Sequence, residues 1–212
     1  MNPSQVNDVL ELLREKLVPE ILSDHLIDEE EGRHPEAIRA AVLLPVFERD
    51  GELFLVFIRR AETLRAHSGE IAFPGGRVET GDRSLVATAV REAQEEIGLE
   101  PERVEIVGLL PPVFTVVSNY IISPVVAFLP RGLGDLCLQT TEVKELIIAP
   151  LSALADPSIA RKERWTRAGQ TRAGQTRTVY FYDYGQYCIW GATGRILKTF
   201  LERLKPEEVS AG

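Results

Sequence analysis

Hydrophobic and polar positions follow two periods along the chain, and each period predicts a different element. Apolar residues recur at helical spacing in 6–17, 86–97 and 194–204, which predicts three helices. Runs rich in β-branched and aromatic residues predict strands at 40–47, 53–58, 104–109, 120–128, 145–148 and 179–182. The acidic stretch 24–33 has no such stripe and is predicted to be a loop.

Asp50 and Gly51 separate the first two predicted strands, and this dipeptide favours a tight hairpin turn. Strands that alternate with helices predict an α/β fold, in which a mixed β-sheet lies between helices as an α/β/α sandwich. At 212 residues and 44% hydrophobic, the chain can bury one sizeable core. We expect residues 1–35 to form a helical appendage and residues 36–212 to form the main domain.

Composition narrows the classes of function. A net charge of −8 and a pI near 5.1 disfavour a nucleic-acid surface, which needs Lys and Arg. The first residues do not resemble a signal peptide, and no apolar run approaches membrane-spanning length. Cys137 and Cys188 lack metal-ligand spacing and are expected to be reduced core residues. We therefore expect a cytoplasmic protein with no nucleic-acid or membrane partner.

Three carboxylates share one face of the helix predicted at 86–97. Residues three and four apart are neighbours on a helix, so Glu92, Glu95 and Glu96 repel one another unless a cation lies among them. A divalent ion with hard oxygen ligands suits that arrangement, and magnesium binds through one or two carboxylates plus substrate phosphates. Glu92 and Glu96 are the preferred ligands, and Glu95 is either a further ligand or a bridge to a second ion.

The stretch from Gly76 to Gly98 resembles the Nudix box, whose general form is a Gly, five residues, a Glu, seven residues, then Arg-Glu-x-x-Glu-Glu-x-Gly. Residues 91–98 match every defined position. The first half departs from the form, because Asp82 stands where Glu is usual and eight residues separate it from Arg91. The resemblance implies a Nudix-type sandwich, catalysis with Mg²⁺ or Mn²⁺, and a metal ligand in the Gly75 carbonyl beside Gly76.

A second signature precedes the box. Residues 65–76 resemble the Arg-x-x-x-Gly-x-x-x-Phe-Pro-Gly-Gly segment of the coenzyme A diphosphatase branch, and 56–61 match its preceding part only in the apolar pair and Arg60. The resemblance also covers 188–193, where Trp190 is expected to serve packing. It implies cleavage of coenzyme A or an acyl derivative to 3′,5′-ADP and 4′-phosphopantetheine.

Coenzyme A carries a 3′-phosphate apart from its diphosphate, so an enzyme for it needs fixed cations away from the metal. Arg59, Arg60 and Arg65 can supply guanidinium groups for phosphate, with solvated surface charge as the alternative for each. His67 can hydrogen-bond a phosphate or cap its loop. Gly76 lets the backbone approach the substrate closely.

The chemistry also needs a general base and an anchor for the acidic helix. Glu142 resembles the Glu of a downstream Glu-Val position in the family and is a candidate base, with Glu145, Glu79 and Glu95 as alternatives. Arg91 is expected to hold a carboxylate by paired hydrogen bonds rather than to touch substrate.

Other readings of these motifs remain open. The same chemistry can act on ADP-ribose, NADH or an oxidised nucleotide, and a nucleotide-binding protein can keep the fold without hydrolysis. The tandem Thr-Arg-Ala-Gly-Gln unit at 166–175 indicates a duplicated surface loop, with a lid over the substrate as the alternative. Oligomeric state cannot be read from the sequence.

Overall fold

A computed structural model describes residues 3–19, 23–62, 69–166 and 176–205 of the chain. Its main sheet contains eight of the described strands, whose central order is β3-β2-β1-β7-β5. These are Ile71–Ala72, Glu52–Arg60, Ile38–Arg49, Tyr120–Phe128 and Glu105–Leu109. The three other strands pair beside this path, namely β4 (Gly75–Arg77) with β1, β6 (Val113–Thr115) with β7, and β8 (Val143–Pro150) with β2.

The sheet is mixed, as the sequence predicts. β1 and β7 run parallel, while the other strand pairs of the sheet are antiparallel. Asp50 and Gly51 have φ values of 54° and 78°, the positive pair that a type I′ hairpin turn requires, and join β1 to β2. The predicted hairpin is therefore confirmed.

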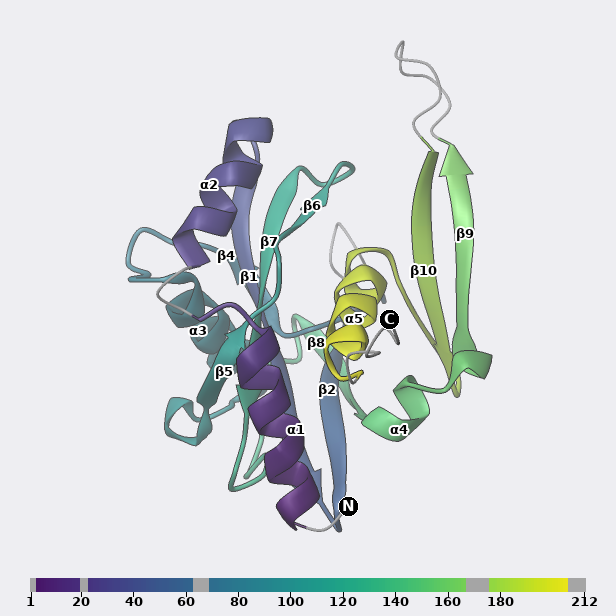
Figure 1. The fold of residues 1–212 in the computed structure, drawn as a ribbon. Helices are drawn as coiled ribbons and strands as arrows, with labels where there is room; N and C mark the ends of the chain where they lie inside the picture. The colour runs from purple at the N-terminus through teal and green to yellow at the C-terminus, as the bar shows by residue number, and fades with distance from the viewer. Residues whose placement is uncertain (1–2, 20–22, 63–68, 167–175, 206–212) are drawn as a thin grey trace, which may run out of the picture.

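Helices cover both faces of this sheet (Figure 1). On one face, α3 (Leu85–Ile97) packs with the even-numbered side chains of β2, among them Val56 and Ile58. On the other face, α1 (Pro3–Lys16) and α5 (Gly191–Arg203) share a core with Leu55 and Phe57. Side chains of neighbouring strand residues point to opposite faces, which explains this division. The predicted sandwich with an N-terminal helix is confirmed.

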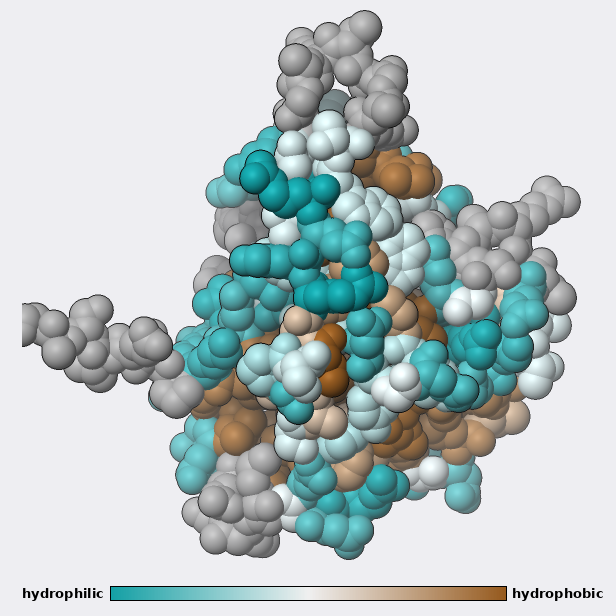
Figure 2. Space-filling model, turned by 90° about the vertical axis from the view of Figure 1, so that its right-hand side faces the viewer, coloured by the Kyte–Doolittle hydropathy of each residue, from teal (hydrophilic) through white to brown (hydrophobic). Residues whose placement is uncertain are grey.

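A second, three-stranded sheet stands beside α5. Its strands are β9 (Ala160–Thr166), β10 (Thr176–Tyr184) and β11 (Tyr187–Trp190), all antiparallel. The short helices α4 (Leu151–Leu154), η2 (Pro101–Arg103) and η3 (Pro157–Ile159) lie in connections. Figure 2 shows the face that carries β9 and β10, where hydrophilic and hydrophobic patches adjoin. The tandem repeat falls mostly at 167–175, outside the described residues.

Two expectations are wrong. The acidic stretch predicted as a loop is a helix, α2 (Ser23–Arg33), because Glu is a good helix former, Arg33 pairs with Glu29 and Glu30 one turn earlier, and Ile27 is buried. Cys137 is exposed and Cys188 only half-buried, so neither is a core residue. In the part of the chain that the structure describes, no helix has the length and apolar character needed to cross a bilayer.

Candidate active site

The helix α3 carries the three glutamates and is fixed at both ends. Ser84 is the N-cap, and its side-chain oxygen accepts a hydrogen bond from the Ala87 amide at 3.1 Å. Gly98 ends the helix in the left-handed conformation at φ 71°. Ala89 and Ala93 are fully buried, so the helix lies close against the sheet. The capped ends and the close packing hold the glutamates in a fixed register.

A glycine turn brings backbone atoms against these carboxylates. The Gly75 amide donates a hydrogen bond to Glu96 Oε2 at 2.9 Å. A Cβ at Gly76 would lie 2.4 Å from the Glu92 carboxyl carbon, and one at Gly75 would lie 2.4 Å from the Ala41 carbonyl oxygen. A Cβ at Gly75 would therefore overlap backbone atoms, whereas a Cβ at Gly76 would displace the Glu92 carboxylate, which accounts for the Gly-Gly pair.

Glu96 is a buried carboxylate with little neutralisation from the protein. Its side chain is 3% exposed, and its nearest cation is Arg60, whose Nη1 lies 3.6 Å away. Burial raises the pKa of Glu96 to about 7 and also raises the pKa of Glu92. Burial of this kind disfavours the ionised form, so a cation between the two carboxylates would stabilise the site.

Glu142 and Glu95 lie at the edge of this pair. Glu142 is exposed in the turn before β8, and its charge adds to the rise in pKa of both Glu92 and Glu96. Glu95 is 60% exposed and accepts a hydrogen bond from Arg91 Nη1 at 3.1 Å. The charges of Glu142 and Glu95 thus both act on Glu92, and Glu95 lies on the solvent side.

Arg91 joins the helix to the loop before it. Its Nε and Nη2 donate to the two Asp82 oxygens at 2.9 and 3.0 Å, and its Nη1 donates to Glu92 at 3.0 Å. Asp82 also accepts hydrogen bonds from the Glu79 amide and the Thr88 hydroxyl. The hydrogen bonds from Arg91 lower the pKa of Asp82 well below its ordinary value. Arg91 and Asp82 therefore act as an anchor, and the longer spacing in the first half of the box is closed by this ion pair.

The two neighbouring arginines of β2 have different surroundings. Arg60 approaches Glu96, and its Nε is buried without a hydrogen-bond partner among the described residues. Arg59 instead donates to Glu145 at 3.1 Å, and Tyr187 donates to the other Glu145 oxygen at 3.2 Å. Arg60 is thus the arginine with unused hydrogen-bonding capacity beside the carboxylates.

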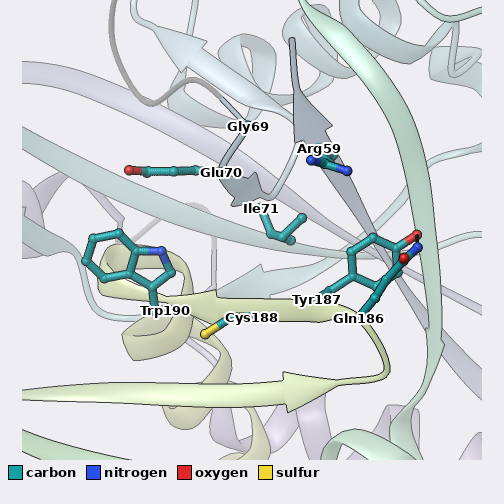
Figure 3. Close-up of a pocket in the computed structure, with 8 residues that line it drawn as sticks. All are labelled: Arg59, Gly69, Glu70, Ile71, Gln186, Tyr187, Cys188 and Trp190. Carbon is teal, nitrogen blue, oxygen red and sulfur yellow. Dashed lines mark hydrogen bonds between the residues drawn. The ribbon is translucent and has the colours of Figure 1, made fainter. Parts of the chain in front are cut away.

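Arg59 borders a cavity of about 370 Å³ between the segment that leads into the glycine turn and β11 (Figure 3). Gly69, Glu70 and Ile71 form one side, and Tyr187 and Trp190 come from β11 on the other. Trp190 also packs against Phe181 at a ring separation of 6.1 Å, as expected of a packing residue. Sequence reasoning missed Tyr187, because its link to Arg59 joins residues far apart in the chain.

Two predicted substrate contacts, Arg65 and His67, lie outside the described residues.

The structure also shows the surroundings of two alternative general bases, Glu145 and Glu79. Glu145 is held by Arg59 and Tyr187, while the Glu79 backbone amide donates to Asp82. Glu142, unlike Glu145 and Glu79, contributes through its charge to the raised pKa of both Glu92 and Glu96.

The donor set suits a hydrated divalent ion. Among the described residues, no three His, Cys, Asp or Glu side chains converge closely enough to hold a metal by themselves. Magnesium binds through one or two carboxylates and keeps several waters, so the buried Glu96 and the half-buried Glu92 beside a glycine backbone meet its needs. The residues present therefore fit a magnesium-like ion better than a fully protein-ligated one.

Comparison with known proteins identifies the family. The family model described as the NUDIX domain matches residues 37–168, more than half of the chain. The chain belongs to the Nudix family. That range includes the glycine turn, α3 and Glu142. Hydrolysis of diphosphate bonds in nucleotide derivatives, generally with divalent metal ions, is the activity of this family, so the prediction of a Nudix hydrolase is confirmed.

Several relatives share most of their length with this Nudix protein. A Photorhabdus laumondii protein named "Uncharacterized Nudix hydrolase NudL" is 37% identical over 166 residues, covering 78% of this chain and 84% of its own. Its Citrobacter koseri namesake is 38% identical over 160 residues, covering 76% and 79%. A solved MutT/nudix family protein from Enterococcus faecalis covers 86% of this chain and 67% of its own, with 15% identity and a TM-score of 0.48.

Proposed function

We propose that this Nudix protein hydrolyses the diphosphate of coenzyme A, or of an acyl derivative, in the presence of Mg²⁺ or Mn²⁺. The observation that carries the hydrolysis is the pair of the buried Glu96 and the half-buried Glu92 against the Gly75–Gly76 backbone, where burial raises the pKa of both carboxyls. The choice of coenzyme A is supported by the Phe-Pro-Gly-Gly segment and by the longer spacing between Asp82 and Arg91.

Each group has a role in this proposal. A dication held by Glu92 and Glu96, with the Gly75 carbonyl as a third candidate ligand, supplies charge neutralisation and a more acidic water. Glu142 accepts the proton of the attacking water, a role supported by its exposure and by the effect of its charge on both glutamates. The oxygen of that water forms a bond to one phosphorus as the bridging P–O bond breaks. The products are 4′-phosphopantetheine and 3′,5′-ADP.

The remaining residues position the substrate and the site. The unused Nε of Arg60 can donate to a phosphate oxygen beside Glu96. Arg91 acts as a positioning residue that keeps Glu92 and Glu95 in place, with Glu95 as an additional ligand on the solvent side. Arg59, held by Glu145, borders a cavity whose volume lies in the range of small-molecule sites and suits one organic arm of the substrate.

A substrate panel tests the proposal directly. Purified protein and Mg²⁺ are incubated with coenzyme A, dephospho-coenzyme A, ADP-ribose, NADH and an oxidised dGTP, and the products are weighed by mass spectrometry. We expect fastest cleavage of coenzyme A and at least tenfold slower cleavage of the dephospho form, which lacks the 3′-phosphate. Equal rates for coenzyme A and its dephospho form would contradict recognition of the 3′-phosphate. Faster cleavage of ADP-ribose, NADH or the oxidised dGTP would assign that compound as the preferred substrate instead.

A further inference from the structure

A second polar recess lies apart from the carboxylates, in a groove of about 620 Å³. We call it the cationic groove. It is lined by the end of α2, by β6, by β10 and by α5, which stand around the upper part of the molecule in Figure 1. β10 and α5 pack on the sheet face opposite to α3. α2, which forms another side of the groove, packs through Ile27 in the same cluster as α3. The groove nevertheless shares no residue with the Glu92–Glu96 pair.

The charge of the cationic groove contrasts with that of the chain. Four permanent cations line it, from Arg33, Arg177, Arg195 and Lys198, against the single carboxylate of Glu30. Their sum is three positive charges (4 − 1) in a protein whose net charge is −8. Such a concentration of one sign in a recess raises the local concentration of anions.

Two of these cations have no partner in the folded chain as far as it is described. Arg33 pairs with Glu30 at 2.8 Å, and Lys198 pairs with Glu202 at 2.6 Å. The side chains of Arg177 and Arg195 make no ion pair or hydrogen bond with any described residue, and both are exposed. Their guanidinium groups come from different elements, β10 and α5, and line the same groove. They can therefore act together on one ligand.

A flat wall completes the recess. The rings of His34 and Phe114 are stacked, with 3.5 Å between centroids and 9° between planes. His34 follows α2 and Phe114 lies in β6, and both rings line the same groove as the arginines of β10 and α5. The stacked rings can contact the ring or sugar of an organic phosphate. A ligand without such a group can still bind to the arginines.

We propose that the cationic groove binds a small phosphate-bearing anion at a site distinct from the carboxylates. Planar guanidinium groups match phosphate oxygens with paired hydrogen bonds, which favours phosphate as the ligand group. The volume lies in the range of small-molecule sites. A long polyanion such as nucleic acid would extend beyond the groove over an acidic protein, and its repulsion there favours a small ligand.

Calorimetric titration with pyrophosphate, in EDTA to keep dications out of the carboxylate site, tests this inference. We expect saturable binding in the micromolar to millimolar range, weakened at least tenfold by the double variant Arg177→Gln/Arg195→Gln. The control double variant Arg14→Gln/Arg49→Gln removes the same charge from exposed positions outside the groove and should bind as the native protein does. Thermal unfolding of all three proteins checks that the fold is kept.

The outcomes separate this inference from the proposed hydrolysis, because no turnover is measured and no metal is present. Absence of saturable pyrophosphate binding would overturn the inference. Equal weakening in both double variants would overturn it as well, because it would show general charge attraction.

A parallel titration with ADP identifies the source of the phosphate. Tighter binding of ADP than of pyrophosphate would indicate a nucleotide that uses the ring wall, and the reverse order would indicate inorganic phosphate.

Discussion

At the scale of single residues, Gly76 leaves no room for a side chain beside Glu92, and the ion pair with Arg91 occupies Asp82. The backbone at Gly76 lies so close to Glu92 that any Cβ would occupy the place of the carboxylate. The Asp82 carboxylate is only 6% exposed and is fully engaged by Arg91, so it cannot also serve as a metal ligand without losing the anchor. Neither Gly76 nor Asp82 is proposed to touch the substrate. Both nevertheless fix the position of Glu92, Gly76 by its close approach and Asp82 through Arg91.

We predict that Gly76→Ala lowers kcat about 10- to 100-fold while changing the free energy of unfolding little. The added Cβ meets only the flexible end of Glu92, so the carboxylate moves rather than the backbone, and a displacement of about 1 Å can have that kinetic effect. Steady-state kinetics and urea unfolding measure the two quantities. Gly81→Ala is the matched control, because a Cβ at Gly81 meets nothing within 4 Å. Unchanged kcat in Gly76→Ala would remove Glu92 from the site.

We predict that Asp82→Asn destabilises the protein by about 2 to 4 kcal/mol at neutral pH, because it leaves Arg91 without its charged partner. The pKa of Asp82 is lowered in the folded state, so its contribution is full above the unfolded pKa of about 3.9. It is lost as the pH falls through the folded pKa. The difference from the native protein should therefore shrink below about pH 4.

Urea unfolding of native and Asp82→Asn proteins between pH 3 and pH 7, a range set roughly by the titration of aspartate, measures this dependence. Asp135→Asn, at an exposed position with no ion pair among those found in the described chain, should follow the native curve at every pH. A deficit of Asp82→Asn that stays constant over the whole range would mean that the carboxylate acts by packing rather than by charge.

At the scale of elements, the sequence predicts best what is local. The helix α3 has an apolar stripe, an N-cap and a C-cap within 15 residues (84–98), so its register and its glutamates follow from spacing alone. The helix α2 was missed because its stability comes from ion pairs and one buried residue, Ile27, rather than from a stripe. β9 is exposed along its whole length and lacks an alternating pattern, and it is absent from the predicted strands.

The same division applies to the candidate site. Glu92, Glu96 and the glycine turn are readable from one motif, because they are joined by short range contacts on α3 and the strand before it. The different surroundings of Arg59 and Arg60 depend on Glu145 and Tyr187, which are 86 residues or more from Arg59. Nothing in the local pattern distinguishes the two arginines, so only the folded chain separates them.

At the scale of the whole molecule, the N-terminal helix is part of the main core. The predicted division into residues 1–35 and 36–212 treats α1 as an appendage. Yet Leu13 is fully buried and belongs to the same hydrophobic cluster as Phe57 of β2 and Phe200 of α5. A helix that buries its apolar stripe in a shared core contributes to the stability of the entire domain, so we propose that α1 unfolds together with the rest of the chain.

We predict that Leu13→Ala lowers the free energy of unfolding by about 2 to 5 kcal/mol, the cost of a buried leucine truncation. Because the core is shared, urea unfolding followed by tryptophan fluorescence should remain one transition with a lower midpoint. The two tryptophans, Trp165 and Trp190, lie in the β9–β11 sheet rather than in α1, so they report on the rest of the domain. Glu11→Ala, exposed on the same helix, should leave the midpoint unchanged. If the fluorescence transition keeps its midpoint in Leu13→Ala while helical signal is lost earlier, α1 unfolds separately and the division at residue 35 holds.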